Sequence, residues 1–448
     1  MLRLSVLDQS TVVTGRSPDT SIRESLALAR HAEALGYARY WVAEHHNSAS
    51  IAGTAPEVLI AAIAATTARI RVGSAGVMLP HYSALKVAEQ FRVLEAIAPG
   101  RIDLGLGRAP GSDGRTAFAL NPLAETAANE FPAQVRDLAA WVAEHHNSAS
   151  IAGTAPEVLI AAIAATTARI RVGSAGVMLP HYSALKVAEQ FRVLEAIAPG
   201  RIDLGLGRAP GSDGRTAFAL NPLAETAANE FPAQVRDLLA WLAGAPLVAG
   251  HPFHDIVAQP QGPTVPEAWM LGSSDYGAQV AAFFGLPYCF AHFITDGRGT
   301  DSALAAYRAQ YRPSARHPEP HAALCVWALA AETEAEAEHL FASRALWRLG
   351  RDRGVYAALP SPEEALAYPY SEAERTRVAR LRARAICGTA DVVAAQLRAL
   401  AAEHGVEEIA VLTTVHDPEA RRRSYTLLAR EFGLDGAAAG TAAPWAAE

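Results

Sequence analysis

The chain has 448 residues, of which half are hydrophobic and 19% are charged, and its formal net charge is −7. This apolar content and the ordinary use of glycine and proline exclude fibrous and wholly disordered proteins. The acidic balance gives no general attraction to nucleic acid or to anionic lipid, so we expect neither as a partner.

The cysteine content and the apolar runs indicate the cellular compartment of the protein. Cys289, Cys325 and Cys387 lie too far apart for a metal-ligand pattern and are too few for a disulfide framework. The first residues alternate and soon become acidic, unlike a signal peptide. The longest apolar run, near 58–65, is far shorter than the roughly 20 residues that span a bilayer. We therefore expect a cytoplasmic protein.

A long internal repeat dominates the first half of the chain, because residues 41–138 recur letter for letter at 141–238. Solenoid repeats are short, numerous and diverged, whereas this is one long pair without divergence. The second copy directly follows a helical pattern at 135–140, with no turn residue between them. This junction favours a recent duplication or an assembly artefact over a tandem pair of domains.

Strand and helix patterns alternate along the rest of the chain. Before the second copy, we predict strands at 2–7, 37–44, 70–79 and 101–106, helices at 21–35, 55–67, 84–97 and 130–138, and a Gly-rich excursion at 109–129. After the second copy, we predict strands at 268–271, 288–293, 322–330 and 409–413, and helices at 275–284, 302–311, 332–349, 391–404 and 418–432. We interpret 354–370 as a loop insertion.

Without the duplicated strands the predicted count is eight, which indicates an α/β fold of the closed (β/α)8 TIM-barrel type. The duplication adds an extra block of three βα units. The expected organisation is a first half of the barrel at 1–140, a surplus copy at 141–240, a second half at 241–434 and a disordered tail at 435–448. A doubly wound open sheet is the alternative, but no G-x-G-x-x-G follows the first strand.

The chemistry of a barrel lies at the carboxyl ends of its strands. The second predicted strand ends in Glu44, His45 and His46. Successive strand residues face opposite sides, so at most one of the two histidines points into the barrel mouth. A metal site is the alternative, but no H-E-x-x-H motif or third ligand at a useful spacing accompanies them.

The third and fourth strand ends suit a flat, anionic ligand. Small residues at 73–76 let a ligand lie close against the backbone, although tight strand packing explains them equally well. Arg108, in a glycine-rich setting, suits a phosphate or carboxylate, and the alternative is an arginine on the surface.

A helix start follows the fifth predicted strand. Ser273 and Ser274 stand there, where hydroxyls and backbone N–H groups can bind an anion or form a plain N-cap. Asp275 would repel a phosphate, so we expect it on the outer side of the turn.

Taken together, these segments resemble the bacterial-luciferase-like family of flavin-dependent monooxygenases. The matching segments are 4–10, 40–47, 55–67, 69–80, 87–111 and 269–282. The resemblance runs from residue 2 to about residue 432, apart from one copy. It implies a TIM barrel that uses reduced FMN and O₂ on a small organic substrate, a flavin reductase as the source of reduced FMN, and a homo-oligomer.

The resemblance also implies roles for individual residues. His45 is expected to be the catalytic histidine beside the flavin ring, and the Ala75–Gly76 peptide would run along that ring and could be cis, as in relatives. The implied cofactor-binding residues are Glu44, Ala75, Gly76, Glu89, Arg108, Ser273, Ser274 and Tyr276. Gly272 stands where family luciferases carry a glutamate, so contacts made by that carboxylate cannot be assumed and light emission is not expected.

Two alternatives remain open at this point. The same barrel could serve a deazaflavin (F420)-dependent hydride-transfer enzyme, which needs a larger and more basic mouth. The duplication could also leave a non-catalytic flavin-binding protein. The basic stretch 375–384 could suggest nucleic acid, but a solvated helix face is favoured in an acidic chain.

The two copies offer rival sets of site residues, with His145 and Arg208 as the counterparts of His45 and Arg108. We expect the first copy to form the active barrel, because residues 37–40 complete its opening strand. In the second copy, residues 137–140 extend a helix instead.

Overall fold

The computed structural model describes residues 4–107, 114–122, 154–168, 170–209, 214–355 and 357–433. These residues form two compact units, one up to residue 268 and one from residue 269. None of the described helices is both long and apolar enough to cross a membrane.

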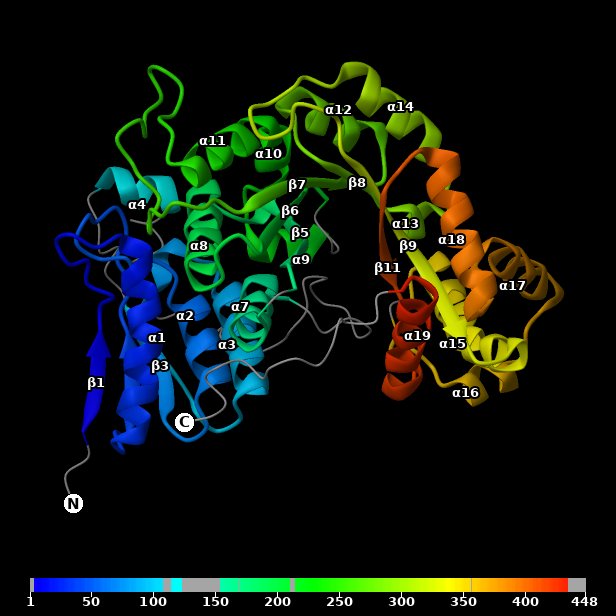
Figure 1. Ribbon diagram of the computed structural model, residues 1–448, viewed down its shortest axis with the longest axis horizontal. Helices are drawn as coiled ribbons and strands as arrows, with labels where there is room; N and C mark the ends of the chain where they lie inside the picture. Colours follow the sequence, from blue (N-terminus) through cyan, green and yellow to red (C-terminus); the bar gives the residue numbers. More distant parts are fainter. Residues whose placement is uncertain are drawn as a thin grey trace. The chain divides into compact units, whose positions relative to one another are not determined.

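The first copy and the residues before it form a four-stranded parallel sheet with helices packed against it (Figure 1). Its elements are β1 (Ser5–Asp8), α1 (Pro18–Ala34), β2 (Arg39–Val42), α2 (Pro56–Thr66), β3 (Arg71–Met78), α3 (Ala84–Ile97), β4 (Ile102–Gly107) and α4 (Gly114–Leu120). The strand order is β1-β2-β3-β4, and Tyr40 aligns with Val6 on one side and with Val72 on the other. Ser83 begins α3, and its side chain accepts a hydrogen bond from the backbone N–H of Lys86.

The second copy repeats much of this pattern. Its described elements, together with the helix that continues it, are α7 (Pro156–Thr166), β5 (Val172–Met178), α8 (Ala184–Ile197), β6 (Ile202–Gly207), α9 (Gly214–Leu220), α10 (Ala224–Asn229) and α11 (Phe231–Ala243). The last of these helices stops at Gly244, which adopts a left-handed conformation with φ of 65°. The strand that would correspond to β2 lies outside the described residues.

Identical helices meet different surroundings in the two copies. The sequence of α2 is apolar on all sides, which is typical of a helix buried all round. Leu59 and Ile63 on α2 are fully buried, whereas Leu159 and Ile163 on α7 are 38% and 45% exposed. Because β1 and α1 lie before the repeat, they were not duplicated, and the second copy has no repeated version of these two elements to cover it.

The two copies nevertheless pack closely within the first unit. Helix α2 of the first copy contacts α7 and α8 of the second, α3 contacts α7, and α1 contacts α8 (Figure 1). Leu185, Val187 and Phe191 on α8 are buried. The second copy is therefore a packed part of its unit, while its being surplus to a barrel stays a prediction.

The second unit has a parallel sheet in the order β7-β8-β9-β10, with β11 also paired to β9. Its strands are β7 (Glu267–Gly272), β8 (Tyr288–Phe290), β9 (Ala322–Ala331), β10 (Ile386–Thr389) and β11 (Glu408–Leu412). Its helices are α12 (Asp275–Phe284), α13 (His292–Thr295), α14 (Thr300–Gln310), α15 (Glu334–Asp352), α16 (Pro362–Ala367), α17 (Glu372–Arg384), α18 (Ala390–His404) and α19 (Pro418–Glu431).

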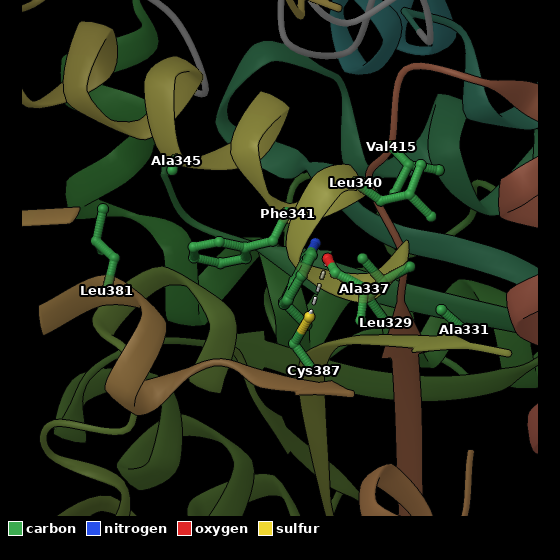
Figure 2. Packing of buried hydrophobic residues seen from close by; sticks show 10 residues of the cluster. Leu329, Ala331, Ala337, Leu340, Phe341, Ala345, Leu381, Cys387 and Val415 are labelled. Atoms are coloured by element: carbon green, nitrogen blue, oxygen red, sulfur yellow. Dashed lines mark hydrogen bonds between the residues drawn. The ribbon is translucent and has the colours of Figure 1, made fainter. Parts of the chain in front are cut away.

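The core of this unit forms where α15 and α17 pack near β9 and β10 (Figure 2). Trp327 and Phe341 meet there with ring centroids 6.0 Å apart. Cys387 lies in the same cluster, and burial raises the pKa of its thiol to about 12. All three cysteines are free, and a thiol that keeps its proton is a poor nucleophile, so Cys387 contributes packing.

The structure corrects several predicted elements. The excursion at 109–129 contains α4, and its counterpart in the second copy contains α9 and α10. The strand predicted at 288–293 ends at Phe290 and gives way to α13. The proposed insertion at 354–370 contains α16, and β10 was missed, whereas the basic stretch 375–384 lies in α17, as the favoured helix interpretation expects. The parallel α/β fold is confirmed, while closure into an eight-stranded barrel stays a prediction.

Candidate active site

The segment that is expected to lie along the flavin ring is at the carboxyl ends of β3 and β4. The register between these strands shifts between Ala75 and Val77, which marks a β-bulge or similar irregularity. Gly76 has φ of 133°, a conformation that residues with a side chain rarely adopt. Ala75 is exposed beside it, so the strand end presents backbone and a small side chain at its surface.

The expectation that the Ala75–Gly76 peptide could be cis is wrong. Over the described ranges the one cis peptide bond is Gln259–Pro260. The bulge and the positive φ of Gly76 give the strand end its irregular course with a trans peptide.

Tight packing explains two other glycines in these strands. A Cβ atom on Gly73 would lie 2.4 Å from the carbonyl oxygen of Asp103, and one on Gly105 would lie 2.3 Å from that of Ser74. Such distances are impossible without backbone movement. Gly73 and Gly105 are therefore required by strand packing, which leaves Ala75 and Gly76 as the part of the segment that suits a ligand.

A buried polar cluster follows β2. The Nε2 atom of His46 lies 2.9 Å from Glu44 Oε1, and its Nδ1 atom lies 2.7 Å from Glu189 Oε2. Lys186 Nζ lies 3.3 Å from Glu44 Oε1. The side chains of Glu44, His46 and Glu189 are fully buried, so each charge depends on the others for compensation.

Two further groups complete the surroundings of Glu44. The backbone N–H of Met78 donates to Glu44 Oε2 at 2.8 Å, which ties the end of β2 to the end of β3. The Tyr82 hydroxyl donates to Glu44 Oε1. Both carboxylate oxygens are thus engaged by protein groups, so Glu44 is placed to hold the strand ends together.

The electrostatics of the cluster follow from these contacts. Burial alone would lower the pKa of His46, but the carboxylates of Glu189 and Glu44 outweigh burial and raise it to about 9. Burial alone would raise the pKa of Glu44, but Lys186 and His46 hold it far below its ordinary value. The structure therefore favours an imidazolium between two carboxylates at neutral pH.

His45 stands between Glu44 and His46 in the segment that follows β2. Its backbone N–H donates to Gly53 O at 3.0 Å, and its side chain is half-buried. Within the described ranges, the buried Nδ1 atom of His45 has no hydrogen-bond partner. A buried polar atom of this kind ordinarily has a hydrogen-bond partner, and a bound ligand would supply one.

The other predicted site residues of the first unit are placed as follows. Glu89 is buried on α3, and Arg108 lies outside the described residues. Arg208, its counterpart in the second copy, is exposed and donates from Nε to Ala228 O at 3.1 Å. In the part of the chain that the structure describes, no group of three or more His, Cys, Asp and Glu side chains is arranged to hold a metal.

The helix start that is predicted to bind an anion lies in the second unit, where β7 is followed by α12. Ser274 is the N-cap in an extended conformation, and its hydroxyl makes no capping hydrogen bond. Ser273 and Tyr276 are half-buried beside it. Asp275 is exposed and accepts a hydrogen bond from Ser302 Oγ at 3.1 Å, which fits its expected place on the outer side of the turn.

Sequence reasoning missed the partners of His46. The signal was present in helix 84–97, where Lys86, Glu89 and Gln90 share one face and stand among apolar residues. All three are buried, and so are their counterparts Lys186, Glu189 and Gln190. Polar side chains on a buried helix face need hydrogen-bonding partners, and here residues of the other copy supply them.

Comparison with known proteins settles the family. The sequence model of the family described as luciferase-like monooxygenase matches residues 2–137 and 138–408, so the two matches meet at the end of the first copy. The chain belongs to the luciferase-like monooxygenase family.

Individual relatives agree with this assignment. The protein YwcH of Bacillus subtilis (strain 168) is 35% identical over 433 residues, which covers 96% of this chain and 99% of the relative. A protein of Escherichia coli (strain K12) named luciferase-like monooxygenase is 39% identical over 289 residues, 64% of this chain and 84% of the relative. The crystal structure of apo-MsnO8 matches with a TM-score of 0.51 and 31% identity, covering 97% of this chain and 99% of that one.

Proposed function

We propose that this luciferase-like family member is an FMN-dependent monooxygenase that uses reduced flavin and O₂ on a small organic substrate. The observation that carries the proposal is the exposed bulge at Ala75 and Gly76, at the same sheet edge as His45. Family membership supports the reaction class, because relatives carry the name monooxygenase. A flavin reductase would supply the reduced FMN.

The residues present fit such a cofactor. Small groups at Ala75 and Gly76 would let a flat ring lie against the backbone, and His45 has a buried nitrogen with no partner among the described residues. Taken by itself, the start of α12 offers Ser273, Ser274 and backbone N–H groups to a phosphate. When bound, reduced flavin would supply the electrons for O₂ activation.

The protein's own residues have separate tasks in this proposal. His45 would hold or move a proton at a ring nitrogen. Glu44 would act as a positioning residue, because its carboxylate ties β2 to the N–H of Met78. Arg108 would contribute to binding of the phosphate end.

A matched pair of variants tests the site. Ala75 and Ala175 are the same residue at the same strand end in the two copies, and both are exposed. Ala75→Trp should abolish binding of FMN, measured by quenching of flavin fluorescence. The indole would occupy the surface at Ala75 where the flavin ring is proposed to lie, and because Ala75 is exposed it would not disturb the core. Ala175→Trp should leave binding intact. Unchanged binding in Ala75→Trp would overturn the proposed site, and loss in Ala175→Trp alone would place it on the second copy.

A further inference from the structure

Buried hydrogen-bond donors gather on β9 and α15 of the second unit. Ser343 and Trp327 are 0% and 4% exposed, and among the described residues neither the hydroxyl of Ser343 nor Nε1 of Trp327 has a hydrogen-bond partner. The same holds, over the same residues, for Nε1 of Trp347 and Nε of Arg348. Buried polar atoms ordinarily have partners, so a group of donors on two elements in contact requires an explanation.

The same stretch of α15 carries a buried charge. Arg344 is 5% exposed, and its guanidinium lies 4.0 Å from the ring centre of Trp327. Within the ranges that the structure describes, Arg344 forms no ion pair and no hydrogen bond. Burial and the nearby Arg348 lower the pKa of the Arg344 guanidinium to about 10, so Arg344 remains charged at neutral pH. A buried charge without an opposite charge is costly, because it has lost its water.

The contact with Trp327 satisfies only part of this guanidinium. The face of an indole attracts a cation, which favours the position of Arg344 over the ring. The N–H groups of a guanidinium lie in its own plane, however, and they need acceptor atoms. The edge of Arg344 is therefore suited to an acceptor that carries a negative charge.

Helix geometry brings the donors of α15 to one face. Arg344 and Arg348 are four residues apart and Arg344 and Trp347 are three apart, so their side chains are neighbours on the helix. Arg344 contacts β9 through Trp327. Arg348 Nη2 lies 3.4 Å from Oδ2 of Asp296, the residue that ends α13. This face of α15 therefore packs toward both β9 and the end of α13.

The position of this face in the sheet suits ligand binding. Helix α13 directly follows the carboxyl end of β8, and Trp327 lies in β9 beyond the residues 322–324 that pair with β8. Ligands of parallel α/β folds bind at the carboxyl ends of the strands. The start of α12, where a phosphate is expected, follows a different strand, β7. The donors of α15 and β9 therefore form a separate candidate site.

The charges at this face select the class of ligand. Arg344 and Arg348 bring two positive charges and Asp296 brings one negative charge, which leaves one positive charge. A single carboxylate would neutralise it, whereas a phosphate dianion would leave an excess negative charge in a buried place. A carboxylate also accepts two parallel hydrogen bonds from a guanidinium, and an indole N–H can donate to it as well.

We propose that the face of α15 that carries Arg344 and Arg348, together with Trp327 of β9, binds the carboxylate group of a small organic acid. Under the proposed function this acid is the substrate of the enzyme. That assignment rests on the proposed function, whereas the binding of a carboxylate does not, because it involves no flavin.

Acetate is the simplest probe of the site, and acetamide is a neutral molecule of nearly the same shape. Each is titrated into the full chain while the indole N–H resonances are followed by NMR, and Trp327→Phe identifies the resonance of Trp327. Acetate should shift this resonance to saturation, and acetamide should not. The resonance of Trp241, whose Nε1 donates to Ile256 O at 3.0 Å, should stay unchanged. A wild-type protein that shows no saturable shift with acetate, or an equal shift with acetamide, would overturn the proposal.

A matched pair of variants tests the guanidinium. Arg344→Met keeps an unbranched apolar stem against Trp327 and should weaken acetate binding at least tenfold, as expected for loss of a charge-assisted hydrogen bond. Arg312→Met is the control, because Arg312 lies over the ring of Phe283 at 4.2 Å but is exposed. Its affinity for acetate should equal that of the wild type. Wild-type affinity in Arg344→Met would remove Arg344 from the site and contradict the proposal.

Titration with FMN separates an organic acid from the phosphate of the cofactor. Arg344→Met should bind FMN as tightly as the wild type does, because the phosphate is expected at the start of α12. A tenfold loss of FMN affinity in this variant, or tighter binding of inorganic phosphate than of acetate, would assign the site to a phosphate and refute the carboxylate. A wild type that binds acetate but no FMN would refute the proposed function alone.

Discussion

His46 Nδ1 lies 2.7 Å from Glu189 Oε2, although the two residues are 143 positions apart and belong to different copies of the repeat. The contact exists because α8 packs against the first copy, so the second copy supplies part of the environment of the first copy's strand end.

The stability of the protein should depend on pH through His46. Its pKa rises from an ordinary 6.5 to about 9 on folding, so the stabilisation is fully present below about pH 6.5 and is lost as pH rises through about 9. A pKa that differs by one between the folded and unfolded states corresponds to about 1.4 kcal/mol of stability. Urea unfolding at a series of pH values should show this decline in the wild type and a smaller one in His46→Gln. An equal decline in both proteins would contradict the assignment.

Identical leucines in the two copies should differ in their contribution to stability. Leu59→Ala removes a fully buried side chain and should cost about 2–5 kcal/mol. Leu159→Ala, at a position 38% exposed, should cost less than half as much. The free energies of unfolding of the two variants provide the comparison, and equal losses would show that the second copy is as well covered as the first.

Much of the fold was predictable because its signals are local. The bounds of α3 and α12 match the predicted helices 84–97 and 275–284, where a serine precedes an apolar period. The strand β10, with four residues, and the short helix α4 were missed because so few residues carry little periodicity.

The site was predictable only in part, for a spatial reason. The position of Glu44, His45 and His46 at the end of the second strand followed from the strand pattern alone. The partners of His46 could not be found this way, since Glu189 and Lys186 reach it only through the packing of the two copies. The duplicated polar face of 84–97 hinted at a partner without identifying it.

Loss of the predicted phosphate ligand should weaken cofactor binding. Arg108→Ala should reduce affinity for FMN by about 1.5–3 kcal/mol, the range for losing a charge-assisted hydrogen bond. Arg208→Ala, at an exposed position bonded to Ala228 O, should have little effect. Equilibrium titration with FMN measures both. Wild-type affinity in a folded Arg108→Ala protein would remove Arg108 from the phosphate site.

The most direct test of the flavin account is single-turnover oxidation of reduced FMN. The wild-type protein is mixed anaerobically with reduced FMN and then with O₂, and the flavin absorbance is followed in wild type, His45→Ala and His145→Ala. We predict that the wild type binds reduced FMN, that His45→Ala abolishes protein-dependent turnover, and that His145→Ala leaves it nearly intact. Failure of the wild type to bind reduced FMN while it binds F420, or full turnover in His45→Ala, would contradict the account.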